Sequence, residues 1–317
     1  MRLFYFFTVL MLIFSEKAFN QTTFDDNVGE TYNLSSIPLR VRDPWILADS
    51  ETKNYYLYVN NRPRIRLYQS KDLKNWSNIG DVFEAWPDFW GKDDFWAPDC
   101  FKYRGKYYLF VTFSSEVVNR GTSILVSDKP TGPFKPLTNK AITPEKWDCL
   151  DGTLFIDQAG DPWVVFSREW LEVKDGQIVA QRLSRGLKRG RGKPKILFTA
   201  SDALWTGAIT FKDIRGFVTD APFLYQSKNG ELLMLWSSFT GSGSYAIGVA
   251  KSKSGNILGP WVHDPMPLNN DDGGHAMIFT DFSDSLRISY HSPNSRDEHL
   301  VIYKIKEVAG KLSIVKE

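Results

Sequence analysis

Three aspartates stand at the start of strand-like apolar runs, where a carboxylate could carry out acid–base chemistry. They are Asp43, Asp151 and Asp220. A single aspartate before a strand is usually a turn residue, because its side chain hydrogen-bonds the nearby backbone. Three carboxylates at one site would instead raise one another's pKa, which is costly unless the site uses them. What decides between these interpretations is whether the fold brings the three together.

The sequence layout around these aspartates recurs five times. Each copy has a polar anchor, an apolar run, a turn and a second run rich in aromatic or β-branched residues. The anchors are separated by 53 to 69 residues and are Asp43, Pro98, Asp151, Asp220 and His275. Hairpins of this composition are typical of an all-β chain, and no long segment with helical periodicity competes with them.

A repeat of this length with three or four strands per unit predicts an all-β, five-bladed β-propeller. The first strand of each blade lines the central channel, so matching residues of the five units converge on the axis. We therefore expect Asp43, Asp151 and Asp220 to face one pocket. Two β-sandwich domains would explain the strand content but not the five matched anchors.

The ordered set of motifs resembles glycoside hydrolase family 43, over about residues 38 to 317. The motifs are Arg42-Asp43-Pro44, Phe95-Trp96-Ala97-Pro98, Leu150-Asp151-Gly152, Asp220-Ala221-Pro222 and Gly274-His275. The resemblance implies a five-bladed propeller and hydrolysis with inversion. Arabinofuranosidases, xylosidases, arabinanases and galactofuranosidases are among the activities it suggests.

The resemblance also implies a role for each carboxylate. Asp43 matches the general base that activates water, and Asp151 matches the carboxylate that orients the acid and adjusts its pKa. Asp220 stands at the general-acid position, where the family usually has the Glu of Glu-Gly-Pro. Glu169 is the reserve candidate for the acid, with a surface or sugar-binding carboxylate as the other interpretation.

His275 matches a family histidine at the channel centre, often near a bound calcium ion through water. The resemblance thus implies a structural calcium ion in the channel, while no cofactor is required for the reaction. A histidine satisfied by neighbours within the core is the alternative interpretation, because one imidazole without further ligands is a weak metal signal.

The aromatic-rich segment Phe83 to Asp99 contains candidate sugar contacts, because aromatic faces stack on the apolar faces of sugar rings. Trp86 and Trp90 are the expected contacts, whereas Phe95 and Trp96 immediately precede a strand and are expected in the core.

Two arginines could hold a hydroxyl or carboxylate of the substrate. Arg42 precedes Asp43, and Arg296 follows the last repeat. The net charge of only +2 predicts neither a nucleic acid nor an acidic surface as partner. The resemblance to the glycoside hydrolase family implies a carbohydrate substrate as the partner.

The chain begins with the features of a secretory signal peptide. Arg2 precedes an apolar run from Leu3 to Phe14, which is too short to span a bilayer. We expect residues 1–20 to be a signal peptide, residues 21–37 a flexible lead-in and residues 38–317 a single propeller domain. This organisation predicts a secreted or periplasmic protein that is not inserted in a membrane after signal removal.

Cys100 and Cys149 each fall at the entry to an innermost strand. A disulfide between them is conceivable in an oxidising compartment, with two buried free thiols as the alternative. The basic stretch from Arg182 to Lys195 lies within the longest interval between anchors. It is expected to be an inserted, solvated hairpin, with anion binding as the alternative.

The leading functional hypothesis is an exported, exo-acting, inverting glycosidase that releases a terminal arabinofuranose, xylose or galactofuranose. The bulky aromatic loop suggests one blocked end of the site, which favours exo action. A non-catalytic carbohydrate-binding propeller is one alternative. A retaining, fructan-processing five-bladed enzyme is another, and it would place its two carboxyls only about 5–5.5 Å apart, compared with about 6.5–9.5 Å for inversion.

Overall fold

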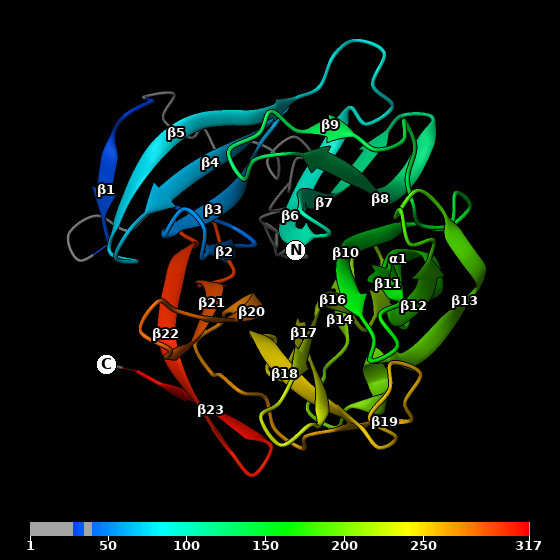
Figure 1. The fold of residues 1–317 in the computed structure, drawn as a ribbon. Coiled ribbons are helices and arrows are strands. Elements are labelled where there is room, and N and C mark those ends of the chain that lie inside the picture. Colours follow the sequence, from blue (N-terminus) through cyan, green and yellow to red (C-terminus); the bar gives the residue numbers. More distant parts are fainter. Residues whose placement is uncertain (1–27, 35–39, 317) are drawn as a thin grey trace, which may run out of the picture.

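Five small antiparallel sheets surround a central axis in the computed structural model, which describes residues 28–34 and 40–316 (Figure 1). The sheets are the blades of a five-bladed β-propeller, as the sequence predicts. The signal peptide expected at residues 1–20 lies outside the described residues. Within the described ranges, no helix is long and apolar enough to cross a membrane.

Each blade is a meander whose first long strand faces the axis. Blade I contains β2 (Trp45–Asp49), β3 (Asn54–Asn61), β4 (Arg64–Ser70) and β5 (Asn75–Glu84), and blade II contains β6 (Asp93–Tyr103), β7 (Lys106–Ser115), β8 (Val118–Ser127) and β9 (Lys135–Pro136). Blade III contains β10 (Cys149–Ile156), β11 (Pro162–Arg168), β12 (Gln177–Leu183) and β13 (Gly190–Thr199). Blade IV contains β16 (Asp220–Gln226), β17 (Leu232–Phe239), β18 (Tyr245–Ser252) and β19 (Trp261–His263). Blade V contains β20 (Gly274–Thr280), β21 (Leu286–Ser292), β22 (His299–Val308) and β23 (Lys311–Val315).

Of the flexible lead-in expected at residues 21–37, the structure describes residues 28–34, and this part contains the strand β1 (Thr31–Asn33). It pairs with the outer edge of β5, with Tyr32 opposite Trp76. A free strand edge presents unpaired backbone groups, and β1 satisfies them in blade I.

The local sequence supplies the turns that the meanders need. Arg104 and Gly105 connect β6 to β7, and both have positive φ, at 50° and 78°. Two such residues form the turn whose twist matches that of the flanking strands. The hairpin turns between β10 and β11 and between β16 and β17 also contain glycines at positive φ, Gly160 and Gly230.

Apolar side chains fill the interfaces between blades rather than one central core. Val165 of blade III packs in one cluster with Met234 and Trp236 of blade IV, and comparable clusters join the other neighbouring blades. The ring closes between blade V and blade I, where the rings of Tyr55 and Phe282 stack at 4.3 Å. Burying one such side chain contributes about 1.5–3 kcal/mol, so these interfaces hold the blades at fixed positions around the axis.

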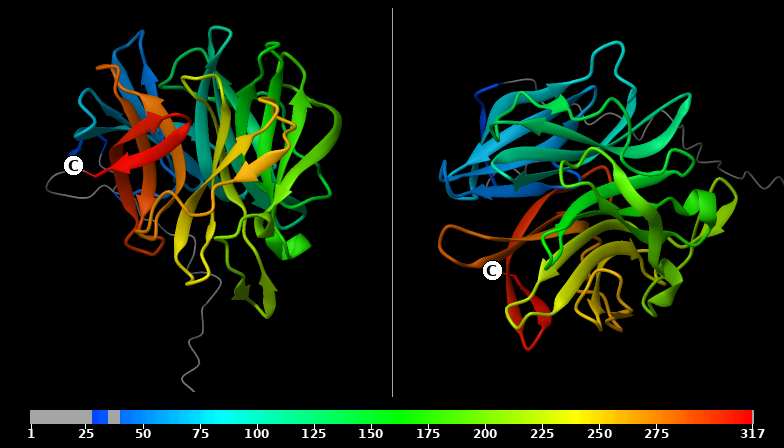
Figure 2. Two further views of the ribbon diagram at one scale, coloured as in Figure 1. Left: turned by 90° about the horizontal axis from the view of Figure 1, so that it is seen from below. Right: turned by 45° about the vertical axis from the view of Figure 1, so that its right-hand side comes forward.

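The longest interval between anchors, from Asp151 to Asp220, is not explained by the insertion that the sequence predicts at the basic stretch. The basic stretch from Arg182 to Lys195 forms the end of β12, the turn and the start of β13, two paired strands of blade III. The added length lies instead in α1 (Trp170–Val173), η2 (Ala200–Asp202) and the hairpin of β14 (Ile209–Phe211) and β15 (Ile214–Gly216). This hairpin projects from one face of the propeller (Figure 2, left).

The two cysteines are buried free thiols, so the structure contains no disulfide between Cys100 and Cys149. Burial raises the pKa of both thiols well above the ordinary value.

Candidate active site

At the same place in every blade, in the inner strand or directly before it, a non-glycine residue has the left-handed conformation. These residues have φ between 47° and 57° and are Asp43, Ala97, Asp151, Ala221 and His275. In blades II to V the strand pairing shifts at this point, as expected for a β-bulge. The bulge turns the side chain of this residue away from the regular strand alternation, and three of the five residues are ionisable.

Asp43 is buried beside two histidines. Its Oδ1 lies 3.0 Å from Nδ1 of His275 and 3.4 Å from Nδ1 of His291. Its backbone N–H donates to His291 Nδ1 at 3.3 Å. Burial raises the pKa of Asp43, but the charge of His275, a hydrogen bond from it and the charge of Arg42 outweigh burial and bring the pKa below its ordinary value. Asp43 is therefore ionised at neutral pH.

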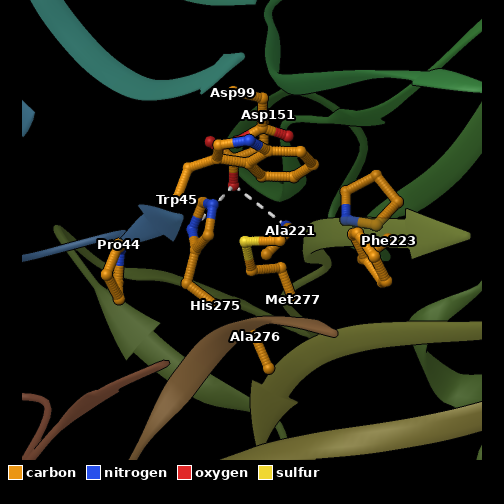
Figure 3. A pocket seen from close by; sticks show the side chains of 10 residues that line it. Pro44, Trp45, Asp99, Asp151, Ala221, Phe223, His275, Ala276 and Met277 are labelled. Carbon is orange, nitrogen blue, oxygen red and sulfur yellow. Dashed lines mark hydrogen bonds and ion pairs between the residues drawn. The ribbon is translucent and has the colours of Figure 1, made fainter. Parts of the chain in front are cut away.

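Asp151 faces the same histidine from the opposite side of the channel. Its Oδ2 lies 3.8 Å from His275 Nδ1 and accepts a hydrogen bond from the N–H of Ala221 at 3.0 Å (Figure 3). Its own N–H donates to Thr112 Oγ1 at 2.9 Å. Asp151 thus fixes the backbone directly after Asp220, which agrees with an orienting role.

His275 lies between the carboxylates as a buried cation. Burial lowers its pKa, but Asp43 and Asp151 outweigh burial and raise the pKa to about 10. Among the described residues, no group of three or more His, Cys, Asp or Glu side chains is arranged to hold a metal ion. The side chains present therefore supply no metal-binding shell of their own, and a calcium ion held through water at His275 stays a prediction.

Asp220 is the first residue of β16 and precedes the left-handed residue of its blade. Its Oδ2 accepts a hydrogen bond from the hydroxyl of Tyr245 at 2.9 Å. Burial, then the charge of Asp151 and then that of Glu169 raise the pKa of Asp220 to about 8. Asp220 is therefore protonated at neutral pH, as a general acid must be.

Glu169 is close enough to influence Asp220 but is held by other partners. Its Oε2 accepts from Arg120 Nη1 at 2.6 Å, and its Oε1 accepts from the N–H of Leu171 at 3.4 Å at the start of α1. Burial raises its pKa and Arg120 opposes this effect. Because both carboxyl oxygens already have a partner, Glu169 is a weaker candidate for the acid than Asp220.

The predicted substrate contacts differ in their surroundings. Trp86 exposes 42% of its surface, whereas Trp90 is half-buried and donates through Nε1 to Ser123 Oγ at 3.0 Å. Arg42 lies beside the base, with Nε 3.9 Å from Asp43 Oδ1. Within the described residues, Arg296 makes no ion pair with these carboxylates and is exposed in the loop between β21 and β22.

Of the two aromatic residues expected in the core, Phe95 is buried there. Trp96 is only half-buried, and the guanidinium of Arg120 lies over its ring at 4.4 Å. The Trp96 ring therefore lies beside the ion pair between Arg120 and Glu169.

Sequence reasoning missed four residues of this site: Asp99, Arg120, Tyr245 and His291. Asp99 lines the same axial cavity as Asp151 and His275 (Figure 3), and burial raises its pKa well above the ordinary value. Its place directly after Ala97-Pro98 in the second repeat was a usable signal. Arg120, Tyr245 and His291 lie on second or third strands, where the repeat pattern carries no such signal.

The arrangement combines two carboxyl groups whose environments drive their pKa values apart. Asp43 is held ionised and Asp220 is held protonated, with His275 and Asp151 between them. Such a pair assigns one carboxyl as base and the other as acid. The site can therefore activate water at one end and protonate a leaving group at the other.

The chain is similar to known glycosidases. The family described as glycosyl hydrolases family 43 matches residues 35–305. The chain is 24% identical to the extracellular exo-alpha-(1->5)-L-arabinofuranosidase ArbA of Cellvibrio japonicus, over 75% of this chain and 71% of the relative. It is 28% identical to the extracellular endo-alpha-(1->5)-L-arabinanase 1 of Bacillus subtilis, over 74% of this chain and 68% of the relative.

A solved structure is considerably more similar. The endo-arabinase from Bacteroides thetaiotaomicron VPI-5482 is 58% identical, with a TM-score of 0.85, and the match covers 88% of this chain and 98% of that structure.

Proposed function

Because the chain belongs to glycosyl hydrolase family 43 and is a glycosidase, we propose that it cuts α-1,5-linked arabinan internally and with inversion, using Asp43 as base and Asp220 as acid. One observation carries the assignment of roles. The pKa of Asp43 is lowered and that of Asp220 is raised to about 8, so at neutral pH each has the protonation state its role requires.

The reaction follows from these protonation states. Asp220 gives its proton to the glycosidic oxygen, and the bond from that oxygen to the anomeric carbon breaks, leaving the electron pair on the departing sugar. Asp43 takes a proton from a water molecule, which attacks the anomeric carbon from the opposite face. The product has the inverted configuration.

Two neighbours support this chemistry. His275 compensates the charge of Asp43 before water is deprotonated. Asp151 holds the N–H of Ala221 and, through its charge, raises the pKa of Asp220. Both effects act in the ground state and prepare the site for proton transfer.

The proposed substrate and mode of action come from similarity. The endo-arabinase of Bacteroides thetaiotaomicron is 58% identical to this chain, which favours an internal cut over the release of single terminal sugars expected from the sequence. The aromatic loop gives little support to a blocked end, because Phe89 and Phe95 are buried in the core.

We also propose that the protein is exported. The apolar run from Leu3 to Phe14 has the length of a signal-peptide core, and two relatives are described as extracellular.

The test is digestion of linear α-1,5-arabinan by the purified protein and by Asp43→Asn and Asp220→Asn variants. Asp128→Asn is a matched control, because this carboxyl is exposed and pairs with Lys106 at the surface. Oligosaccharides as first products, with inverted anomeric configuration by NMR and with activity lost in both site variants, would support the proposal.

Other results would identify the alternatives. Arabinose as the sole early product would mean exo action, and a retained anomer would mean a covalent intermediate. Full activity of Asp220→Asn on arabinan would overturn its assignment as the acid.

A further inference from the structure

The hydroxyl of Tyr245 is the hydrogen-bond donor to the carboxyl of Asp220, at 2.9 Å from Oδ2. Tyr245 starts β18, the third strand of blade IV, and only 3% of its surface is exposed. A side chain buried to this degree is unsuited to binding substrate through its ring. Its hydroxyl is nevertheless directed at the carboxyl group of Asp220, the proposed acid.

Neighbouring blades fix the position of the Tyr245 ring. The ring lies over Gly274 of blade V, where an added Cβ atom would be 2.1 Å from Cε1 of the tyrosine. Gly274 has no positive φ that would require glycine, so the space occupied by the ring is the reason for its small size. The N–H of Tyr245 also donates to Asp272 Oδ1 at 2.7 Å.

The same ring connects the acid to the base. Tyr245 and His291 stack with centroids 5.8 Å apart and an interplanar angle of 16°. His291 in turn accepts the N–H of Asp43. The stacked aromatic pair thus links Asp220 to Asp43. The separation of these two carboxyl groups decides whether a water molecule and a sugar fit between them.

We propose that Tyr245 is a positioning residue for the proton donor: its hydroxyl holds Oδ2 of Asp220, so that Oδ1 carries the proton toward the leaving oxygen. This inference rests on the proposed function of Asp220. The tyrosine keeps its own proton throughout. When Oδ1–H gives its proton to the glycosidic oxygen, the hydrogen bond from Tyr245 stabilises the carboxylate that remains.

The bond to Tyr245 also opposes the other influences on Asp220. Burial and the charges of Asp151 and Glu169 raise the pKa of Asp220, whereas the Tyr245 hydroxyl and the charge of His275 lower it. Arg42 is a further charged group facing Asp220. Removal of the hydroxyl should therefore move the basic limb of the activity profile to higher pH.

The experiment measures kcat of Tyr245→Phe on two substrates that have the same sugar units but different leaving groups. With linear arabino-oligosaccharides, whose leaving group needs a proton, we expect kcat to fall about 10-fold or more. With the 2,4-dinitrophenyl glycoside of arabinotriose, whose leaving group needs no proton, we expect kcat within about 3-fold of wild type. In Asp220→Asn, the added Tyr245→Phe change should cause no further loss, because the tyrosine acts through Asp220.

Two further variants keep the test decisive. Gly274→Ala displaces the ring while keeping the hydroxyl. It should also lower kcat on the oligosaccharides but not on the dinitrophenyl glycoside, so it replaces Tyr245→Phe if that variant does not fold. Tyr58→Phe is the matched control, because it removes another buried hydroxyl, bonded to the Pro130 carbonyl at 2.6 Å, away from the carboxylates. Tyr58→Phe should leave the ratio of kcat on the two substrates as in the wild type.

The inference and the proposed function fail in different ways. Equal losses on both substrates, or wild-type kcat on oligosaccharides in Tyr245→Phe while Asp220→Asn is inactive, would overturn the positioning role alone. An Asp220→Asn variant that remains fully active on oligosaccharides would overturn the acid assignment itself.

Discussion

Nδ1 of His275 lies 3.0 Å from Oδ1 of Asp43, so the proposed base is paired with a buried cation. This pair joins blade V to the neighbouring blade I, between residues 232 positions apart in the chain. Without the imidazolium, Asp43 and Asp151 would be left as buried carboxylates without their shared partner.

We therefore predict that His275→Ala lowers the free energy of unfolding by about 3 kcal/mol or more and abolishes arabinan hydrolysis. The pKa of His275 is raised from 6.5 to about 10, so its contribution to stability is full below pH 6.5 and is lost as the pH rises through about 10. Urea denaturation at pH 6 and pH 10 measures the free energy of unfolding and its pH dependence, and an arabinan assay measures hydrolysis. His299→Ala, on β22, serves as control, and an unchanged stability of His275→Ala at pH 6 would contradict the prediction.

The pH dependence of activity should reflect the two carboxyl groups. Asp220 must be protonated, so kcat/KM on arabino-oligosaccharides should fall as the pH rises through about 8. Asp43 must be ionised, and its lowered pKa places the acidic limb below the ordinary range of an aspartate. A pH profile of initial rates tests this, and a basic limb that persists unchanged in a residual activity of Asp220→Asn would argue against the assignment.

Glu169→Gln should separate the two candidates for the acid. The amide still reaches Arg120 but removes the negative charge that helps to raise the pKa of Asp220. We expect activity within about 10-fold of wild type at neutral pH and a basic limb shifted to lower pH. Asp220→Asn, measured in parallel on the same oligosaccharide, should lose far more. The reverse order of losses would make Glu169 the acid.

Trp86 and Trp90 should respond differently to truncation. The exposed ring of Trp86 can stack on a sugar, so Trp86→Ala should raise KM for long oligosaccharides by about 2- to 10-fold and leave the melting temperature nearly unchanged. Trp90 packs against Phe113 at 5.9 Å and bonds Ser123, so Trp90→Ala should lower the free energy of unfolding by about 2 kcal/mol. Steady-state kinetics and thermal melts distinguish the two, and an unchanged KM in Trp86→Ala would exclude a sugar contact there.

Both cysteines should titrate as thiols only after unfolding. Cys100 and Cys149 are buried, and burial raises the pKa of each thiol, so neither reacts readily in the folded protein. A thiol reagent should detect both in guanidinium without reductant and almost none under native conditions. An absence of thiols in guanidinium would reveal a disulfide and contradict the structure.

Much of the fold could be predicted from the sequence because each repeated structural unit has the same pattern of residues along the chain. Each blade begins with a polar anchor before an apolar strand, and five such anchors predict five blades. The prediction that the basic stretch accounts for the longest interval between anchors was wrong. That stretch has an unusual composition, whereas α1 and the hairpin of β14 and β15, which do add the length, have no distinctive composition.

The sequence by itself determined the propeller and the residues Asp43, Asp151 and His275, because matching positions of inner strands converge on one axis. The tertiary structure alone decided that Asp220 lies one residue before the left-handed position of its blade, occupied by Ala221. It also decided that Arg120 engages Glu169 and that Tyr245 holds Asp220. These contacts join different strands or blades, and their geometry depends on how the side chains pack, which no spacing along the chain encodes.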